Sequence, residues 1–162
     1  DVEAPDGDPS SITGRCSALA LDAGDNPRIA YNDSTHEDLK YIPYSSLLLS
    51  WGTPSIVDDS LGESVCYNSL VLDQAGGPHI LYYDGKVPGS LRYARRPAGS
   101  DWRIETVDGP AASCGMHSSV AMDSPGRLHA AYYCATELKY AYRFLPGQSN
   151  GISATLPLLL ED

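Results

Sequence analysis

Hydrophobic and polar residues alternate along short segments of this chain, and this alternation is typical of β-strands. In residues 28–33, for example, Ile29 and Tyr31 fall on one face of a strand, whereas Ala30 and Asn32 fall on the other. Short stretches rich in Gly, Asn and Asp, residues that favour turns, separate such segments. No stretch shows the 3.6-residue period of an amphipathic helix, so the pattern predicts an all-β fold.

The strand pattern occurs three times. Asp22, Asp73 and Asp123 each end the first segment of one copy, and the surrounding residues match in the same order in all three copies. The matched segments are 17–22, 68–73 and 118–123, then 27–33, 78–84 and 128–134, then Leu-Lys/Arg-Tyr at 39–41, 91–93 and 138–140. A match of this length indicates an internal triplication. We therefore divide a single repeat domain, residues 1–162, into units of about 16–65, 66–115 and 116–160.

Each unit is predicted to contain four short strands, the last of them beginning near Trp51 in the first unit and Trp102 in the second. Repeats of about 40–50 residues with four strands each are typical of β-propeller blades. The expected fold is thus three four-stranded antiparallel sheets arranged as propeller blades. Because propellers close with roughly four to eight blades, three blades make an incomplete ring in one chain.

The second unit shows the blade motif most fully, as L-D-x-x-G-x-P-H-I-x-Y-Y-D over residues 72–84, followed by Leu91-Arg-Tyr-Ala94 and Trp102. This motif resembles a repeat of secreted bacterial β-propeller proteins that are grouped loosely with sialidase-like or BNR-repeat propellers. The resemblance covers about nine-tenths of the chain. It implies the blade fold but no single function, because propellers host lectins, hydrolases, receptors and structural parts. The sialidase Asp-box, S-x-D-x-G-x-x-W, is not present in that order.

Charge and composition exclude several classes of partner. The chain has 11 Lys and Arg against 21 Asp and Glu, for a net charge of −10. Nucleic-acid binding and polybasic membrane binding need clustered cations, so neither is expected. No apolar run approaches the roughly 18 residues of a transmembrane helix, and we expect no membrane span. Eleven Tyr and two Trp indicate a core that relies on aromatic packing.

The four cysteines, at positions 16, 66, 114 and 134, form no C-x-x-C pair, so a zinc ribbon is not expected. Their even number and the acidic composition favour a secreted, disulfide-bonded protein. Cys134 replaces the Asp that ends the second strand in the other units, beside the loop that holds Cys114, which favours a Cys114–Cys134 bond. Cys16 and Cys66 precede the first strands of successive units and are the expected second pair. The main competing pairing is Cys66–Cys114.

Positions that differ between the units are the candidates for function, because residues shared by all three serve the scaffold. Tyr67 and His117 occupy equivalent positions before the first strands, with Cys16 as the third equivalent, and Glu63 lies in the loop before Tyr67. These loops lie at the end where propellers commonly bind ligands. We therefore predict that Tyr67, His117 and Glu63 contribute to a ligand site.

His36 completes the predicted set. With Glu37 and Asp38 it offers ligand atoms for a metal or an acid/base pair, although an exposed acidic loop would have the same composition. Asp58-Asp59 is a weak candidate for Ca²⁺, without the ligand spacing of a known loop. We expect no metal site and no cofactor. No G-x-S-x-G or H-E-x-x-H motif is present, and no catalytic residue is assigned.

The leading functional prediction is a non-catalytic extracellular module for binding or self-assembly. Three blades leave two exposed faces, so we expect a homo-oligomer, most simply a dimer with six blades. The apolar segment 152–160 would pair with another subunit, or alternatively cover the edge of its own blade. Two other functions stay open. One is a carbohydrate-binding, lectin-like propeller, and the other is a glycoside hydrolase or sialidase-like enzyme that uses a carboxylate pair or a Tyr–Glu pair.

Overall fold

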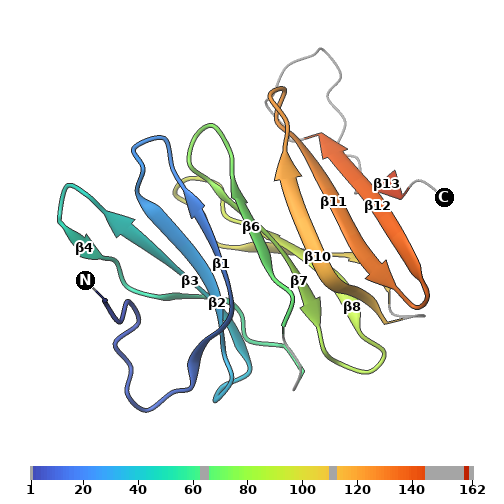
Figure 1. Cartoon of the computed structure of the whole chain (residues 1–162), viewed down its shortest axis with the longest axis horizontal. Coiled ribbons are helices and arrows are strands. Elements are labelled where there is room, and N and C mark those ends of the chain that lie inside the picture. The colour runs from blue at the N-terminus through green and yellow to red at the C-terminus, as the bar shows by residue number, and fades with distance from the viewer. Residues whose placement is uncertain (1, 63–65, 110–112, 145–158, 161–162) are drawn as a thin grey trace.

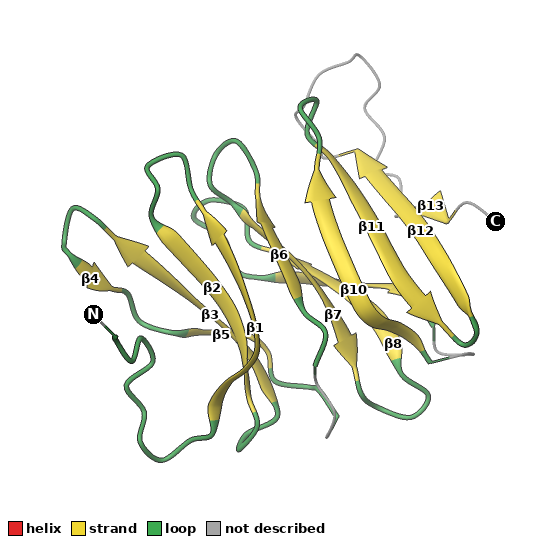
Figure 2. Cartoon of the chain, in the orientation of Figure 1, coloured by secondary structure: helices red, strands yellow, loops and turns green. Residues whose placement is uncertain are grey.

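A computed structural model describes residues 2–62, 66–109, 113–144 and 159–160. Within these ranges the regular structure consists of β-strands in three antiparallel sheets, as the alternating pattern predicts (Figure 2). The described part of the chain contains no helix, and therefore none that would be long and apolar enough to cross a membrane.

Sheet 1 has five strands, not the predicted four, in the order β1-β2-β3-β4 with β5 also paired to β3. Its strands are β1 (Thr13–Leu21), β2 (Pro27–Asp33), β3 (Asp38–Ser45), β4 (Ser50–Trp51) and β5 (Ser55–Asp58). The extra strand arises because Gly52, Thr53 and Pro54 interrupt the expected fourth strand, and a proline has no N–H for the ladder.

Sheets 2 and 3 have four strands each, in simple chain order. Sheet 2 contains β6 (Ser69–Leu72), β7 (Pro78–Asp84), β8 (Ser90–Arg95) and β9 (Arg103–Asp108). Sheet 3 contains β10 (Cys114–Met122), β11 (Arg127–Cys134), β12 (Glu137–Phe144) and β13 (Leu159–Leu160). The two residues of β13 pair with Ala141 and Tyr142 of the same chain, which is the alternative considered for the C-terminal segment. Residues 152–158 of that segment lie outside the described residues.

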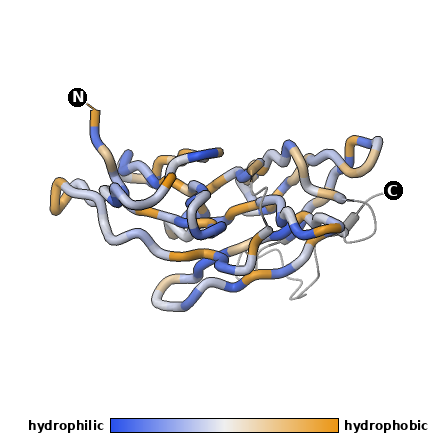
Figure 3. Tube along the Cα trace, turned by 90° about the horizontal axis from the view of Figure 1, so that it is seen from below, coloured by the Kyte–Doolittle hydropathy of each residue, from blue (hydrophilic) through white to orange (hydrophobic). Residues whose placement is uncertain are grey.

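The three sheets stand side by side in chain order (Figure 1). Their first strands are neighbours, since β1 contacts β6 and β6 contacts β10. Figure 3 shows hydrophobic residues, in orange, along the strands. Successive side chains of a strand point to opposite faces, and the consecutive residues Ile80 and Leu81 of β7 belong to different apolar cores, so sheet 2 carries apolar side chains on both faces. We call the face toward the preceding sheet the leading face and the face toward the following sheet the trailing face.

Two apolar cores fill the spaces between the sheets. The leading face of sheet 2, with Ile80 and Tyr82, packs against Leu39 and Tyr41 of sheet 1. Its trailing face packs against sheet 3 in a second core that contains Leu81, Leu91, Tyr93, Leu128 and Tyr132. The equivalent residues Tyr31, Tyr82 and Tyr132 are all buried, as their repetition predicts. Aromatic packing thus supplies much of both cores.

The two tryptophans occupy different surroundings, contrary to the equivalence expected from the repeat. Trp102 precedes β9 and packs against the core between sheets 1 and 2, with its ring centroid 5.5 Å from that of Tyr41. Trp51 belongs to β4, where it lies at the rim against Tyr44. Both side chains are half-buried. The interruption after Trp51 explains the difference, because β4 is displaced from the position that β9 takes in sheet 2.

The repeated Asp after each first strand organises the following turn. Asp22 accepts a hydrogen bond from the backbone N–H of Gly24, and Asp73 accepts one from Gly77. Asp123 accepts one from Arg127 in the same way. These bonds support the structural role expected for the three aspartates.

Candidate ligand-binding site

The residue before or within each first strand has a left-handed backbone. Cys16, Tyr67 and His117 have φ angles of 50°, 71° and 54°. In β1 and β10 this residue falls at a shift of the ladder register, which marks a β-bulge. A bulge turns the strand locally and redirects its side chain. Since a left-handed backbone is costly for residues other than glycine, its repetition shows that the surrounding structure imposes it.

The structure brings two of the predicted site residues together. The ring centroids of Tyr67 and His117 lie 4.3 Å apart, with 51° between the ring planes. Tyr83 joins them, with its centroid 6.5 Å from that of Tyr67. His117 is exposed and both tyrosines are half-buried, so the rings form a surface platform that we call the aromatic cluster (Tyr67, Tyr83 and His117).

Tyr83 is a site residue that the sequence analysis missed. It stands beside the buried Tyr82 in a motif shared with the third unit, and for that reason it looked like scaffold. The signal that identifies it is Gly89, two residues before its strand partner Leu91, because a Cβ added at Gly89 would collide with the Tyr83 ring. The ring therefore lies directly against backbone, which fixes its orientation.

Neighbouring bonds hold the aromatic cluster in place. Cys66, the residue before Tyr67, is bonded to Cys16 of sheet 1. The Ser118 hydroxyl donates a 2.8 Å hydrogen bond to the backbone oxygen of Tyr67. Asn68 donates from its amide to the side-chain oxygen of Asn32, 3.1 Å away. The site thus joins all three sheets through one disulfide and two hydrogen bonds.

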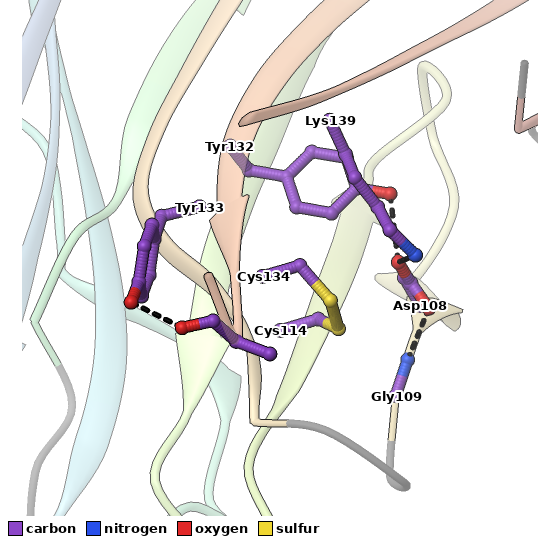
Figure 4. Close-up of a disulfide and its surroundings, with 8 residues drawn as sticks. Asp108, Gly109, Cys114, Tyr132, Tyr133, Cys134 and Lys139 are labelled. Atoms are coloured by element: carbon purple, nitrogen blue, oxygen red, sulfur yellow. Dashed lines mark hydrogen bonds and ion pairs between the residues drawn. A yellow bond between two sulfur atoms is a disulfide. The ribbon is translucent and has the colours of Figure 1, made fainter. Parts of the chain in front are cut away.

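The second disulfide joins Cys114 to Cys134, which face each other across β10 and β11 (Figure 4). The two disulfides are the pairings that the sequence analysis favoured, and the chain has no free cysteine. Asp108 lies close enough to both sulfurs to suggest a metal site. Because the sulfurs are bonded to each other, however, they are not thiolates, and this group does not support a metal.

Each junction between sheets contains a buried polar group, which we call a polar triad: an Asp from one sheet with a Tyr and a cation from the next. At the first junction the Tyr82 hydroxyl donates to Asp58 at 2.6 Å, and Arg92 donates to the same oxygen at 2.7 Å. Burial acts to raise the pKa of Asp58, but the Tyr82 and Ser60 hydrogen bonds and the Arg92 charge outweigh it and hold the pKa below its usual value.

The second junction repeats the arrangement with different atoms. Tyr132 donates to Asp108 at 2.9 Å, and the Lys139 ammonium lies 3.2 Å from the same carboxylate oxygen (Figure 4). Repetition identifies these triads as links between sheets. The aspartate considered for Ca²⁺, Asp58, is therefore already compensated by Arg92.

His36 belongs to a different group of side chains from the aromatic cluster. Its Nδ1 lies 2.9 Å from Asp33 Oδ2 and 3.3 Å from Ser11 Oγ. A Ser-His-Asp relay requires the serine and the aspartate on opposite ring nitrogens. Here both contact the same nitrogen, so the arrangement does not activate Ser11 as a nucleophile.

Asp33 and Asp38 form a cross-strand pair whose pKa values are shifted in opposite directions. Burial acts to raise the pKa of Asp33, but the Lys40 and His36 hydrogen bonds hold it well below its usual value. Burial and the Asp33 charge raise the pKa of Asp38. Such a divergence is typical of acid/base sites. The Asp33 side chain is 0% exposed, however, and a substrate cannot reach it. Glu63, the remaining predicted residue, lies outside the described residues.

No protein-family model matches this chain, and no curated protein sequence matches it. Solved structures match it in fold. An endo-arabinase from Bacteroides thetaiotaomicron VPI-5482 is 13% identical, with a TM-score of 0.58 over 87% of this chain and 59% of that chain. A bifunctional GH43-CE protein of Bacteroides eggerthii is 12% identical, with a TM-score of 0.54 over 89% of this chain and 21% of that one.

A fucose lectin from Kordia zhangzhouensis, solved in complex with methyl-fucoside, is 13% identical with a TM-score of 0.56. The alignment covers 90% of this chain and 96% of the lectin chain. This chain thus spans about three fifths of the arabinase and a fifth of the GH43-CE protein, but nearly all of the lectin. At these identities the likeness is one of fold, an all-β chain of antiparallel sheets.

Proposed function

We propose that this chain is a non-catalytic, extracellular carbohydrate-binding module built of β-propeller blades. The observation that carries the proposal is the aromatic cluster, three rings held at one end of the first strands by a disulfide and a pair of bulged residues. The C–H groups of a sugar ring pack on aromatic faces, while tyrosine hydroxyls and amides nearby bond its hydroxyl groups.

The arrangement of the sheets supports the propeller part of the proposal. Sheets 1 and 2 each pack their trailing face on the leading face of the next sheet, with the first strands adjacent and a polar triad at each of the two junctions. This is how blades succeed one another around a propeller axis. Two disulfides and the acidic composition support an extracellular location.

The contacts of the carboxylates near the aromatic cluster favour binding without catalysis. Glycoside hydrolysis generally needs a protonated carboxyl and a second carboxylate, both facing the sugar. Asp58 and Asp108 instead bond to a tyrosine and a cation, and Asp33 is buried beneath Lys40 and His36. The structural alignment with the fucose lectin covers nearly all of both chains, which also supports binding over hydrolysis.

A glycan array with the purified chain tests the proposal. We expect the wild-type chain to bind a limited set of glycans, and Tyr67→Ala to weaken that binding at least tenfold, about 1.4 kcal/mol. Tyr133→Ala is the matched control, because Tyr133 is the equivalent of Tyr83 in sheet 3 but lies outside the aromatic cluster, and it should bind as wild type. Failure of the wild-type chain to bind any glycan, or unchanged binding by Tyr67→Ala, would contradict the proposal.

Hydrolysis can be tested with the same samples. A panel of fluorogenic glycosides, including an arabinoside and a fucoside, should release no fluorophore above the rate in buffer. Turnover that is lost in Asp38→Asn would instead assign the chain an enzymatic function that uses the carboxyl with the raised pKa.

A further inference from the structure

The two outer faces of the three-sheet array expose apolar residues whose equivalents are buried inside it. On the trailing face of sheet 3, Leu138 is 83% exposed, whereas Leu91 at the same register in sheet 2 is 0% exposed. On the leading face of sheet 1, Leu19 is 63% exposed, whereas its equivalent Leu70 is 7% exposed. Each outer face therefore has the composition of half an inter-sheet core.

The first residues of the chain match the outer strand of sheet 2. Residues 2–7 read Val-Glu-Ala-Pro-Asp-Gly, and residues 104–109 read Ile-Glu-Thr-Val-Asp-Gly. In β9 the register shifts between Asp108, which faces Leu91, and Thr106, which faces Arg92. Val107 is thus the bulged residue, and Pro5 stands at its place in the N-terminal segment. A bulge is one of the few positions in a strand that tolerate a proline.

The N-terminal segment also occupies the place of an outer strand. Asp6 lies beside Tyr31 and Lys40, just as Asp108 lies beside Tyr132 and Lys139, with Asp6 Oδ2 3.9 Å from the Lys40 ammonium. Burial and the neighbouring Asp6 raise the pKa of Tyr31. Asp6 therefore lies where the aspartate of a polar triad would be, at the leading face of sheet 1, although its Oδ2 makes no hydrogen bond to Tyr31 and no described sheet precedes it.

A cavity lies where the rest of the preceding sheet would be. It has a volume of about 480 Å³ and is bounded by residues 4–9 on one side and by Ile29, Tyr31 and Ile42 of sheet 1 on the other. At the two internal junctions the corresponding space is filled by apolar side chains of the preceding sheet. Residues 2–6 belong to no described strand, but they lie across this cavity from sheet 1, where the outer strand of a preceding sheet would be.

We propose that residues 3–6 form an outer strand on sheet 3 of a second copy of this chain, so that copies assemble head to tail with exchanged strands. The register follows from β8 and β9: Asp6 faces Leu138, Ala4 faces Lys139 and Glu3 faces Tyr140. In the described chain β13 pairs only with Ala141 and Tyr142, and no described strand pairs with the outer edge of residues 137–140.

The two junctions within the chain indicate that the partner of the outer faces is a second copy of the same chain. The trailing face of one unit packs on the leading face of the next at both junctions within the chain, and the outer faces repeat those two surfaces. Joining them is a heterologous contact, which makes a ring when it closes. Two copies give six sheets, within the roughly four to eight blades of propellers. The assembly does not depend on glycan binding, so either proposal can fail alone.

Site-directed disulfide formation between two copies tests the exchange. One preparation carries Glu3→Cys and the other Tyr140→Cys, each in the full chain, whose native cysteines are all bonded. We expect the oxidised mixture to yield a covalent dimer that contains a peptide linked from position 3 to position 140. Glu137→Cys, an exposed position three residues away on the same strand, is the out-of-register control and should give at least tenfold less dimer.

The proposal is overturned if the mixture gives no more dimer linked from position 3 to position 140 than the control gives from position 3 to position 137. It is also overturned if a single chain that carries both Glu3→Cys and Tyr140→Cys forms the 3–140 bond within itself at high dilution. A chain without residues 1–6 supplies an independent check. It should retain the all-β circular dichroism spectrum and sediment as a monomer. If it sediments as the same oligomer as the full chain, the exchanged strand does not hold the assembly.

Discussion

The trailing faces of sheets 2 and 3 carry the same side chains in different surroundings. Each has an Asp–His–Tyr relay in which His Nδ1 bonds the tyrosine hydroxyl, at 2.5 Å in sheet 2 and 2.6 Å in sheet 3, while Nε2 contacts the aspartate. The relays are Asp73–His79–Tyr93 in sheet 2 and Asp123–His129–Tyr140 in sheet 3. The first relay is buried by the following sheet, and the second is partly exposed.

The comparison shows that the relay geometry comes from within one sheet. His129 and Tyr140 adopt the arrangement of His79 and Tyr93 although no described sheet covers them. What the following sheet adds is exclusion of water and a few contacts of its own, such as Arg143, which lies 5.5 Å above the Tyr93 ring. A preformed face of this kind needs little rearrangement to receive a partner, which favours association.

The largest difference is expected when the same leucine is shortened on the two faces. Leu91→Ala removes a fully buried side chain from the core between sheets 2 and 3 and should cost about 3 kcal/mol of unfolding free energy. Leu138→Ala should cost less than about 0.5 kcal/mol in dilute solution, because that side chain is exposed in the single chain. Urea unfolding monitored by tryptophan fluorescence measures both. If both variants lose the same unfolding free energy at low protein concentration, the two leucines lie in the same surroundings and the comparison fails.

A smaller effect is expected from the polar triads. Tyr132→Phe removes a hydrogen-bond donor from the charged Asp108 and should cost about 2 kcal/mol. Tyr31→Phe makes the equivalent change beside Asp6, whose segment is not part of a described sheet. It should cost less in dilute solution, and its cost should rise with protein concentration as the proposed assembly forms. If the loss of unfolding free energy in Tyr31→Phe does not depend on protein concentration, Asp6 has no role in the assembly.

The smallest effect is a dependence on pH. Burial lowers the pKa of His79, outweighing the opposing effect of Asp73. The folded state therefore binds fewer protons at this site than the unfolded chain, whose histidine pKa is about 6.5. The stability contribution is full above that value and is lost as the pH falls below it toward the depressed folded pKa. His79→Gln should flatten this part of the stability curve relative to His129→Gln; identical pH profiles for the two variants would contradict the role of burial.

The sequence predicted those features that depend on period and repetition. Alternation predicted the strands, and the triplication placed Cys134 opposite Cys114 and brought Tyr67 near His117. The interruption of the fourth strand of sheet 1 was missed, because Gly52 and Pro54 act on a strand whose counterpart in sheet 2 is continuous. Tyr83 was missed because its exposure depends on a contact with Gly89 that no local pattern records.

Asp6 shows a second limit of pattern reading. The sequence around Asp6 shows little likeness to Val57-Asp58, but the structure places Asp6, like Asp58, beside a tyrosine and a cation. The match is hidden because Pro5 replaces a valine and because the loop that follows differs in length among the units. Contacts between sheets, not local sequence, reveal the correspondence.

Light scattering coupled to size exclusion, over a concentration series of the full chain, tests most directly whether the two outer faces are partners. The chain has a mass of 17.3 kDa, and we predict a species of twice that mass at high concentration that dissociates on dilution. A constant mass of 17.3 kDa across the series would contradict the account, because Leu138 and Leu19 would then stay exposed in solution with no second copy to cover them.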